Sequence, residues 1–580
     1  MLMNTLTLRN SKLAYLLIGI ILFVSFAFVL SAIGYYNFCY IEQGRTFLYH
    51  SAYIGSTASQ PGGCVQLLSD FLIQFFVYPS AGIVITALLL TLIAVLTAHT
   101  LHRHTESRWL LPLALLPVIP LACLHYNTNY QYAGTMAFLL MTAFLSIQTR
   151  FRRFAVRLGY SVISTLLLFV MAGPVALLYG CCLLILELLR NYKQAVWFVV
   201  LPLLAYLCGK ACLWMGLAGE LKHVLLPDGY FTLRLQAGSI VCQPWIMMAG
   251  VCLATGVSYK SVRIKSKRWQ SILIILQLAG IGLFAANEAK QYVSRSNEAF
   301  KELDYHARNE QWDTVIEKCK HLSMSNLLFQ NYLHMALAEK GRLADELFRQ
   351  PCIDIRSIYV SGNKTPYVST LLSDIYFSMG HIAFAQRCAF EANEGWGNFS
   401  PRMLQRLIQT NLIYGQYEVA RKYIEVLEAT FFYKDLATSY RRFLHNDAAV
   451  EADSLLGSKR NCLFPDNRFA GSKGLDDDLK EIVLHNPSHK ATILYLGSLY
   501  LLSKDIPRFQ STLETFYGTP ALPAVLPVCF QEGVAVFAAG NPDILQRYNI
   551  QAGILQRFDA FNQGSSREQG SLWHFLKYRN

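Results

Sequence analysis

Glu42 is the residue of this chain whose type and position best suit it to chemistry. It follows the first apolar run of the sequence, and Gln43 and Arg45 come directly after it. A carboxylate at the end of a membrane span can accept a proton from a hydroxyl group and so act as a general base. A nearby arginine can hold a phosphate group through two hydrogen bonds. The sequence therefore predicts Glu42 as a catalytic residue and Gln43 and Arg45 as substrate-binding residues.

Four more polar residues lie in loops that we expect on the same side of the membrane: His125, Lys222, His223 and Arg234. We predict that they bind substrate, with the cations facing an anionic group. The alternative is that these residues and Glu42 are solvated anchors at the membrane surface. Asp70 lies in a stretch, residues 64–78, whose apolar side chains repeat at helical spacing, so we expect an interfacial helix with Asp70 on its solvated polar face.

Long apolar segments must position these residues. A helix needs about 20 predominantly apolar residues to cross a membrane. The sequence predicts about nine such segments: residues 13–34, 81–101, 109–124, 132–147, 158–171, 175–189, 195–215, 239–257 and 270–287. The two beside Gly173 and Pro174 are short, which leaves a range of seven to nine. The first could be a signal peptide cleaved near Ala32, but its length favours an uncleaved span.

The charge distribution predicts the orientation. The net charge is +13, and residues 1–289 hold 19 Lys and Arg against 7 Asp and Glu, whereas residues 290–580 hold 32 against 31. The surplus therefore lies between the spans, which argues against nucleic-acid binding. The loops that this span prediction places on the side of the N-terminus carry 15 basic residues, and the loops on the other side carry three. Because cytoplasmic loops are enriched in Lys and Arg, we expect a cytoplasmic N-terminus and structured outer loops at residues 35–79 and 216–238.

The sequence of residues 290–580 is typical of a soluble helical domain, which we expect outside the cytoplasm. The pattern Gly-x-apolar-x-x-Ala occurs at Gly380–Ala385 and again 35 residues later at Gly415–Ala420. These residues resemble tetratricopeptide (TPR) repeats, which have a period of about 34 residues. The resemblance covers residues 300–430 and 488–550, with a polar, irregular insertion expected at residues 445–478. Such solenoids usually bind protein partners and rarely catalyse.

The membrane half, residues 13–290, distantly resembles the C-type (GT-C) membrane glycosyltransferases. The resemblance consists of many spans, an acidic residue in the first outer loop, here Glu42, and an amphipathic helix after it. It implies a donor linked to a polyprenyl phosphate carrier in the membrane. Members often have a second acidic cluster in the outer loop between the third and fourth spans, but residues 125–131 contain no carboxylate. This departure puts metal-assisted donor binding in doubt, and we expect neither a metal nor a cofactor.

The sequence thus predicts an all-α protein: a polytopic bundle, residues 1–289, followed by a TPR-like domain, residues 290–580. The layout resembles that of bacterial membrane proteins without an assigned activity, and it implies the inner membrane with the C-terminal domain in the periplasm. The leading hypothesis is a GT-C-like envelope transferase, and the alternative is a non-catalytic membrane-anchored scaffold for an envelope protein complex. A transporter is disfavoured because the spans contain few ionisable residues.

Overall fold

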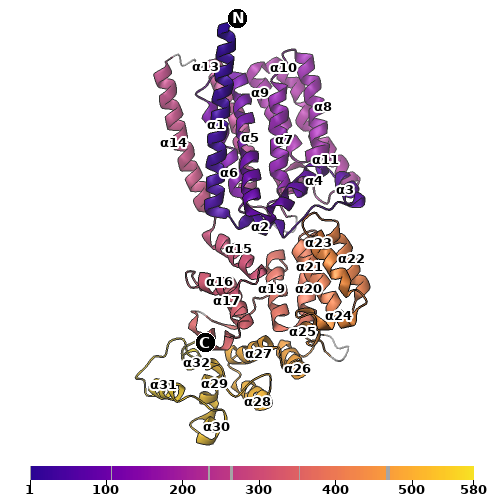
Figure 1. The fold of residues 1–580 in the computed structure, drawn as a ribbon. Coiled ribbons are helices and arrows are strands. Elements are labelled where there is room, and N and C mark those ends of the chain that lie inside the picture. Colours follow the sequence, from indigo (N-terminus) through magenta and orange to yellow (C-terminus); the bar gives the residue numbers. More distant parts are fainter. Residues whose placement is uncertain are drawn as a thin grey trace. The chain divides into compact units, whose positions relative to one another are not determined.

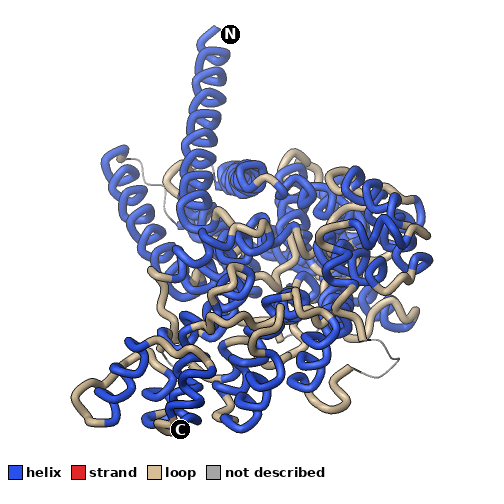
Figure 2. The backbone as a smooth tube through the Cα atoms, turned by 60° about the horizontal axis from the view of Figure 1, so that its bottom comes forward, coloured by secondary structure: helices blue, strands red, loops and turns tan. Residues whose placement is uncertain are grey.

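The structure is a computed structural model. It describes residues 2–105, 107–232, 236–261, 266–351, 353–464 and 470–579, and for residues 2–15 and 257–261 it describes the backbone alone. Within these ranges the chain forms helices and no strands, apart from isolated bridges between Tyr130 and Phe231 and between Tyr517 and Leu522 (Figure 2). The prediction of an all-α fold is confirmed for the described residues.

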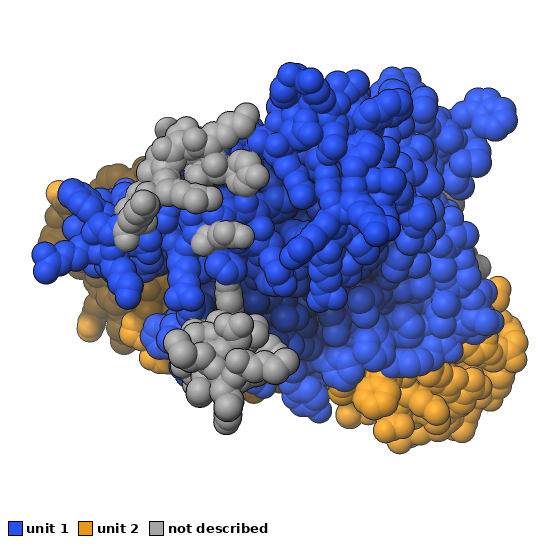
Figure 3. Space-filling model, turned by 90° about the horizontal axis from the view of Figure 1, so that it is seen from above, with its two compact units in different colours: residues 1–298 blue, residues 299–580 orange. Residues whose placement is uncertain are grey.

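The chain divides into two compact units, residues 1–298 and residues 299–580, which Figure 3 shows in different colours. We refer to them as unit 1 and unit 2. The helices of unit 1 come from the long apolar runs of the sequence, and most of them run side by side (Figure 1). They are α1 (Leu2–Gly34), α5 (Pro79–Thr105), α6 (Val118–Leu124), α7 (Ala133–Gln148), α8 (Phe154–Ala172), α9 (Val175–Arg190), α10 (Tyr192–Phe198), α11 (Val200–Trp214), α13 (Gln243–Ser261) and α14 (Lys267–Tyr292).

Six segments of unit 1 are long and apolar enough to cross a membrane: Leu16–Gly34, Pro79–Thr105, Phe154–Ala172, Tyr192–Trp214, Ser239–Gly256 and Lys267–Tyr292. The chain is therefore a membrane protein with several spans. Six of the nine predicted segments reach this length, whereas residues 109–124, 132–147 and 175–189 form shorter helices, so the number of spans, nine with a range of seven to nine, stays a prediction. Helices α7 and α9 have 16 residues each, or about 24 Å at 1.5 Å per residue, against a hydrocarbon core of about 30 Å. The segment 109–124 divides into a 3₁₀ turn, Leu111–Leu115, and the short α6.

Short helices fill the two long loops of unit 1. Residues 35–79 form α2 (Asn37–Glu42), α3 (Ser51–Ala58), α4 (Gly63–Ile73) and the 3₁₀ helix η1 (Gln74–Val77); residues 216–238 include α12 (Leu221–Leu225) and the 3₁₀ helix η3 (Pro227–Tyr230). Helices α2, α3 and α4 lie at one end of the bundle (Figure 1). We call this set of loops, together with residues 125–132 and the turn at Gly173, the end layer.

Hydrogen bonds join the segments of the end layer. Gly62 N donates to Val170 O at 3.0 Å and Gln131 N donates to Tyr230 O at 2.8 Å. The hydroxyl of Tyr230 donates to Ala172 O at 2.5 Å and accepts from Val175 N at 3.1 Å. A side chain at Gly62 would be strained, because φ is +82° there and a Cβ atom would lie 3.2 Å from the Ala172 carbonyl. The end layer therefore connects segments that are far apart in the sequence.

Unit 2 consists largely of consecutive helix pairs. The first four are α15 (Arg295–Arg308) with α16 (Trp312–Cys319), α17 (Leu327–Glu339) with α18 (Leu343–Glu346), α19 (Pro366–Met379) with α20 (Ile382–Gly395), and α21 (Pro401–Ile413) with α22 (Tyr417–Glu428). Helices α23 (Lys434–Tyr440), α24 (Asp447–Ala452), α25 (Leu456–Arg460) and α26 (Leu475–His485) follow. The remaining ones are α27 (Lys490–Leu502), α28 (Ile506–Phe516), α29 (Val528–Ala538), α30 (Pro542–Arg547), α31 (Ala552–Asn562) and α32 (Leu572–Tyr578).

The repeated Gly-x-apolar-x-x-Ala pattern marks where the pairs turn. Gly380 and Gly415 have φ values of +83° and +70°, which end α19 and α21 in the left-handed conformation that glycine adopts without strain. Ala385 and Ala420 are completely buried, so small side chains allow close helix contact at both positions. The expected irregular insertion at residues 445–478 is instead partly helical, because α24 and α25 lie within it and α26 begins there.

Candidate functional site

Glu42 and Gln43 lie at the end of α2, inside the end layer. Both are buried, with exposed fractions of 1% and 3%. Helix α2 is held in place at its start, where the Asn37 side-chain amide donates to His125 O at 2.8 Å, and by an edge-to-face contact of Phe38 with Phe76. Glu42 is therefore part of a packed layer and not a solvated anchor.

Arg45 forms an ion pair with Asp70, with 2.9 Å between Nε and Oδ2. Tyr53 Oη donates to the same oxygen at 2.7 Å, and Gln66 Nε2 donates to Oδ1 at 2.8 Å. The Asp70 side chain is completely buried, so its expected place on a solvated helix face is wrong. Burial raises the pKa of Asp70, while Arg45 and the hydrogen bonds act in the opposite direction. This carboxylate organises the first loop.

His125 is buried beneath an aromatic cluster. Its Nε2 lies 3.0 Å from Thr135 Oγ1, and its ring packs against Tyr130 and Tyr132 with centroid distances of 5.7 and 4.9 Å. Burial lowers the pKa of His125 to about 3, so the imidazole is neutral at physiological pH. It can donate or accept a hydrogen bond, but it supplies no charge to a phosphate group.

The other predicted residues lie in the second long loop. Lys222 is half exposed and forms an ion pair with Glu220 at 2.7 Å. His223 is half-buried in α12, and Arg234 lies outside the described residues. The end layer thus brings Glu42, Gln43, Arg45 and His125 to one end of unit 1, together with the loop that carries Lys222 and His223. Two of the predicted substrate-binding cations, Arg45 and Lys222, already have acidic partners.

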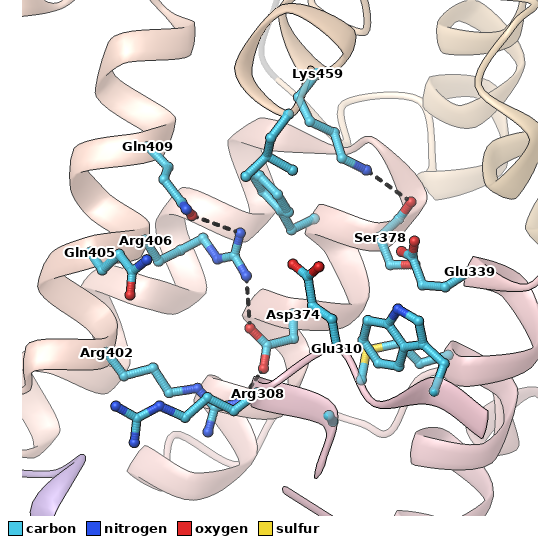
Figure 4. A pocket seen from close by; sticks show the side chains of 15 residues that line it. Arg308, Glu310, Glu339, Asp374, Ser378, Arg402, Gln405, Arg406, Gln409 and Lys459 are labelled. Atoms are coloured by element: carbon cyan, nitrogen blue, oxygen red, sulfur yellow. Dashed lines mark hydrogen bonds and ion pairs between the residues drawn. The ribbon is translucent and has the colours of Figure 1, made fainter. Parts of the chain in front are cut away.

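A pocket that the sequence did not predict lies in unit 2 (Figure 4). Its volume is about 250 Å³. The first helices of four successive pairs, α15, α17, α19 and α21, supply most of its wall. It is lined by Ala307, Arg308, Glu310, Trp312, Met335, Glu339, Asp374, Phe377, Ser378, Arg402, Gln405, Arg406, Gln409, Leu455 and Lys459.

Alternating charges form one wall of this pocket. Arg402 Nη1 donates to both carboxylate oxygens of Asp304, each at 2.8 Å, and its Nη2 donates to Asp374 at 2.5 Å. Arg406 donates to the other oxygen of Asp374 at 3.0 Å and to Gln409 at 3.0 Å. Each of these four charged side chains has an opposite charge beside it, as burial requires. We call Asp304, Arg402, Asp374 and Arg406 the charge network.

Lys459 closes the pocket opposite the charge network. Its Nζ lies 2.8 Å from His489 Nε2 and 3.4 Å from Ser378 O. Glu339 accepts a hydrogen bond from Ser378 Oγ at 2.5 Å and lines the same space. The pocket therefore offers hydrogen-bond donors and acceptors on several sides.

One sequence signal could have revealed the pocket. Arg402, Gln405, Arg406 and Gln409 have the spacing i, i+3, i+4 and i+7, which places four polar side chains on one face of α21. Such a face is ordinarily solvent-exposed, and the sequence does not show that three neighbouring helices cover it. The helix-pair arrangement was needed to identify it as a pocket.

Comparison with protein families finds a match over residues 9–578, nearly the whole chain, to a family of unknown function (DUF6057). No curated protein matches the chain, and no solved structure matches it. The match extends over both units.

Proposed function

The chain belongs to the DUF6057 family, and since the function of that family is unknown, we propose one from the structure: a membrane-anchored docking protein. In this proposal the spans of unit 1 hold the protein in the bilayer. The helix pairs of unit 2 bind an extended segment of a partner protein in the pocket between α15, α17, α19 and α21. This is the scaffold alternative raised by the sequence, with a defined binding site.

The observation that carries the proposal is the composition of the pocket wall. Stacked helix pairs present their first helices on a common face, and such faces serve as binding surfaces in repeat proteins. Here that face contains the pocket, whose wall has the polar side chains of Arg308, Gln405 and Glu339 and the aromatic ring of Trp312. Polar side chains can pair with the backbone of an extended peptide, and an aromatic ring can cover one of its side chains.

The end layer supports this choice over a transferase. Arg45 and Lys222 each have an acidic partner at 2.9 and 2.7 Å, and His125 is neutral. A lipid phosphate would have to displace these partners, and at Arg45 it would leave the completely buried Asp70 without its cation, which is costly.

The test is site-specific photo-crosslinking of the full-length protein in its own membrane. A benzoylphenylalanine at Gln405, inside the pocket, should give a discrete adduct whose crosslinked peptide comes from one segment of one partner. The matched control is the same probe at Lys422, an exposed position on α22, which should not give this adduct. Equal adducts at both positions, or none at Gln405, would exclude docking in the pocket.

A second candidate is the GT-C-like transferase, with Glu42 as the general base toward the acceptor of a polyprenyl-phosphate-linked donor. It is favoured by the burial of Glu42 and Gln43, because exclusion of water is typical of catalytic carboxylates. In this case Glu42→Gln should lower turnover by roughly 10²–10⁴. Since the donor is undefined, the readout is complementation of a loss-of-function envelope phenotype at matched protein levels. Full complementation by Glu42→Gln would exclude an essential base.

We also propose that the N-terminus lies in the cytoplasm and unit 2 outside it, in the periplasm of an inner membrane. The 15-to-3 distribution of basic residues supports this orientation. A reporter that is active only outside the cytoplasm should be active after Asn580 and silent near Arg153 and Lys265. The reverse pattern would invert the orientation without affecting the docking proposal.

A further inference from the structure

Lys459 is a buried lysine with no acidic partner. It belongs to α25, its exposed fraction is 6%, and it lines the pocket of unit 2. Its Nζ interacts with a carbonyl oxygen, Ser378 O, and with an imidazole nitrogen, His489 Nε2. Among the described residues, no carboxylate lies within the 4.0 Å of an ion pair. A buried ammonium without a counter-ion is costly, so this environment favours the neutral amine.

The hydrogen bonds around His489 define its tautomer. Thr492 Oγ1 donates to Met379 O at 2.8 Å, so its lone pairs are left to accept the Nδ1–H of His489 at 2.7 Å. His489 Nε2 then carries a lone pair, which accepts a hydrogen bond from Lys459 Nζ at 2.8 Å. Burial, followed by Lys459, lowers the pKa of His489 to about 3, so this imidazole stays neutral. Lys459 is thus oriented by an acceptor that does not neutralise its charge.

A second cation shares an aromatic ring with Lys459. The guanidinium carbon of Arg406 lies 3.7 Å and the Nζ of Lys459 lies 5.1 Å from the centroid of Phe377. Burial and Arg406 lower the pKa of Lys459, while Glu339 and Cys462 act in the opposite direction. Desolvation and a neighbouring cation are the two conditions that make a lysine nucleophilic at neutral pH.

We propose that Lys459 is a covalent carbonyl-binding residue, whose neutral amine in the pocket condenses with a small aldehyde or ketone. The Nζ lone pair attacks the carbonyl carbon and forms a C–N bond. The two amine protons leave with the carbonyl oxygen as water, and a C=N bond remains, so no oxidant or reductant is needed. Glu339 lines the same pocket and can protonate the departing oxygen.

The size of the pocket limits the ligand. A volume of about 250 Å³ corresponds to roughly eight water molecules at about 30 Å³ each. This space fits a carbonyl compound of a few carbon atoms. The inference does not depend on the docking proposal, because it concerns the chemistry of one side chain and not the occupant of the whole concave face.

The test uses the full-length protein in lipid nanodiscs with glycolaldehyde as the probe and cyanoborohydride to reduce the imine. Peptide mass spectrometry then gives the labelling rate of each lysine from pH 6 to pH 10. At pH 7 Lys459 should react at least about tenfold faster than the exposed Lys320 and Lys422, because each pKa unit changes the neutral fraction tenfold. This preference should disappear in 8 M urea. A rate for Lys459 equal to or below that of the exposed lysines would overturn the proposal.

Two variants of Arg406 separate the chemical role from a structural one. Arg406→Lys keeps a cation over Phe377 and should leave the pH profile of Lys459 labelling in place. Arg406→Gln removes that cation and should move the profile to higher pH, with a roughly tenfold loss of rate at pH 7. If both variants react as the wild type does, the neighbouring cation does not activate Lys459 and the proposal fails. Lys459→Arg should abolish the fast adduct, and its persistence would assign it to another residue.

Discussion

Replacement of Arg402 by methionine is expected to destabilise unit 2 more than any exposed substitution. Arg402 is the central cation of the charge network, and the side chains of Arg402, Asp304 and Asp374 are 7%, 5% and 14% exposed. Methionine has a similar length but no charge. The variant would leave Asp304 with a hydrogen bond from Tyr332 at 2.7 Å, and Asp374 would keep Arg406 at 3.0 Å. The main defect is therefore a buried Asp304 without a cation.

The expected loss is about 3–5 kcal/mol of unfolding free energy, the range for removal of one partner of a buried ion pair. Most of this cost comes from the charge left behind and not from the lost attraction. The double variant Arg402→Met with Asp304→Asn should therefore be more stable than the single variant by at least about 2 kcal/mol. The matched control is Arg387→Met, since Arg387 is 68% exposed and pairs with Glu391. Its effect should stay below about 1 kcal/mol.

Buried thiols provide the assay in the full-length protein. Cys319 and Cys388 are buried in unit 2, so their modification in increasing urea reports the unfolding of that unit separately from the membrane helices. A loss below about 1 kcal/mol for Arg402→Met would refute the reasoning, because it would mean that the orphaned carboxylate is readily solvated or protonated. A double variant no more stable than the single one would refute the assignment of the cost to Asp304.

Three further predictions follow from buried side chains. Ala385→Leu should overpack the contact between α20 and its neighbouring helix and lower the free energy of unfolding by about 1–3 kcal/mol in the same urea assay. The control Ala383→Leu, at a half-buried position of the same helix, should change this free energy very little. Equal effects of the two substitutions would contradict the helix-pair packing. Asp70→Asn should lower the thermal midpoint of unit 1, because it removes the buried partner of Arg45; no change would mean that Asp70 is solvated after all. Glu532 accepts a hydrogen bond from the backbone at the start of α32, and burial raises its pKa from the ordinary 4.5 to about 7. Because the folded state binds this proton more tightly, the contribution of Glu532 to stability should be complete below about pH 4.5 and should be lost, by up to about 3 kcal/mol, as the pH rises to 7. Glu532→Gln should remove this contribution, which is measured by comparing hydrogen exchange of α32 in the two proteins at pH 5 and pH 8.

The helices were predictable because their signals are local. The run at residues 270–287 contains no charge, and the pattern at Gly380–Ala385 determines a turn and a close contact within six residues. The number of spans was not predictable in the same way. Whether a 16-residue apolar helix such as α7 crosses a membrane depends on what surrounds it, and the sequence of the segment does not contain that information.

The polar contacts were missed because their partners are distant in sequence. Asp70 was expected on a solvated face, since the stretch around it shows only the helical period, whereas its partner Arg45 lies 25 residues earlier. The charge network joins Asp304 to Arg402 across 98 residues. A buried polar residue is recognisable only together with its partner, and single-sequence patterns do not identify partners.

The end layer has a consequence for how the protein is made. Its hydrogen bonds connect Gly62 to Val170 and Gln131 to Tyr230, so these contacts cannot all form until Tyr230 has been synthesised and has left the ribosome. At a typical rate of about 5–20 residues per second, the first loop waits on the order of ten seconds or more for Tyr230 to arrive. During that interval the earlier spans are already in the bilayer, while α2, α3 and α4 lack their final partners. Nascent chains that end before Tyr230 should therefore carry an open first loop, and the closing of this layer is a late step in biogenesis.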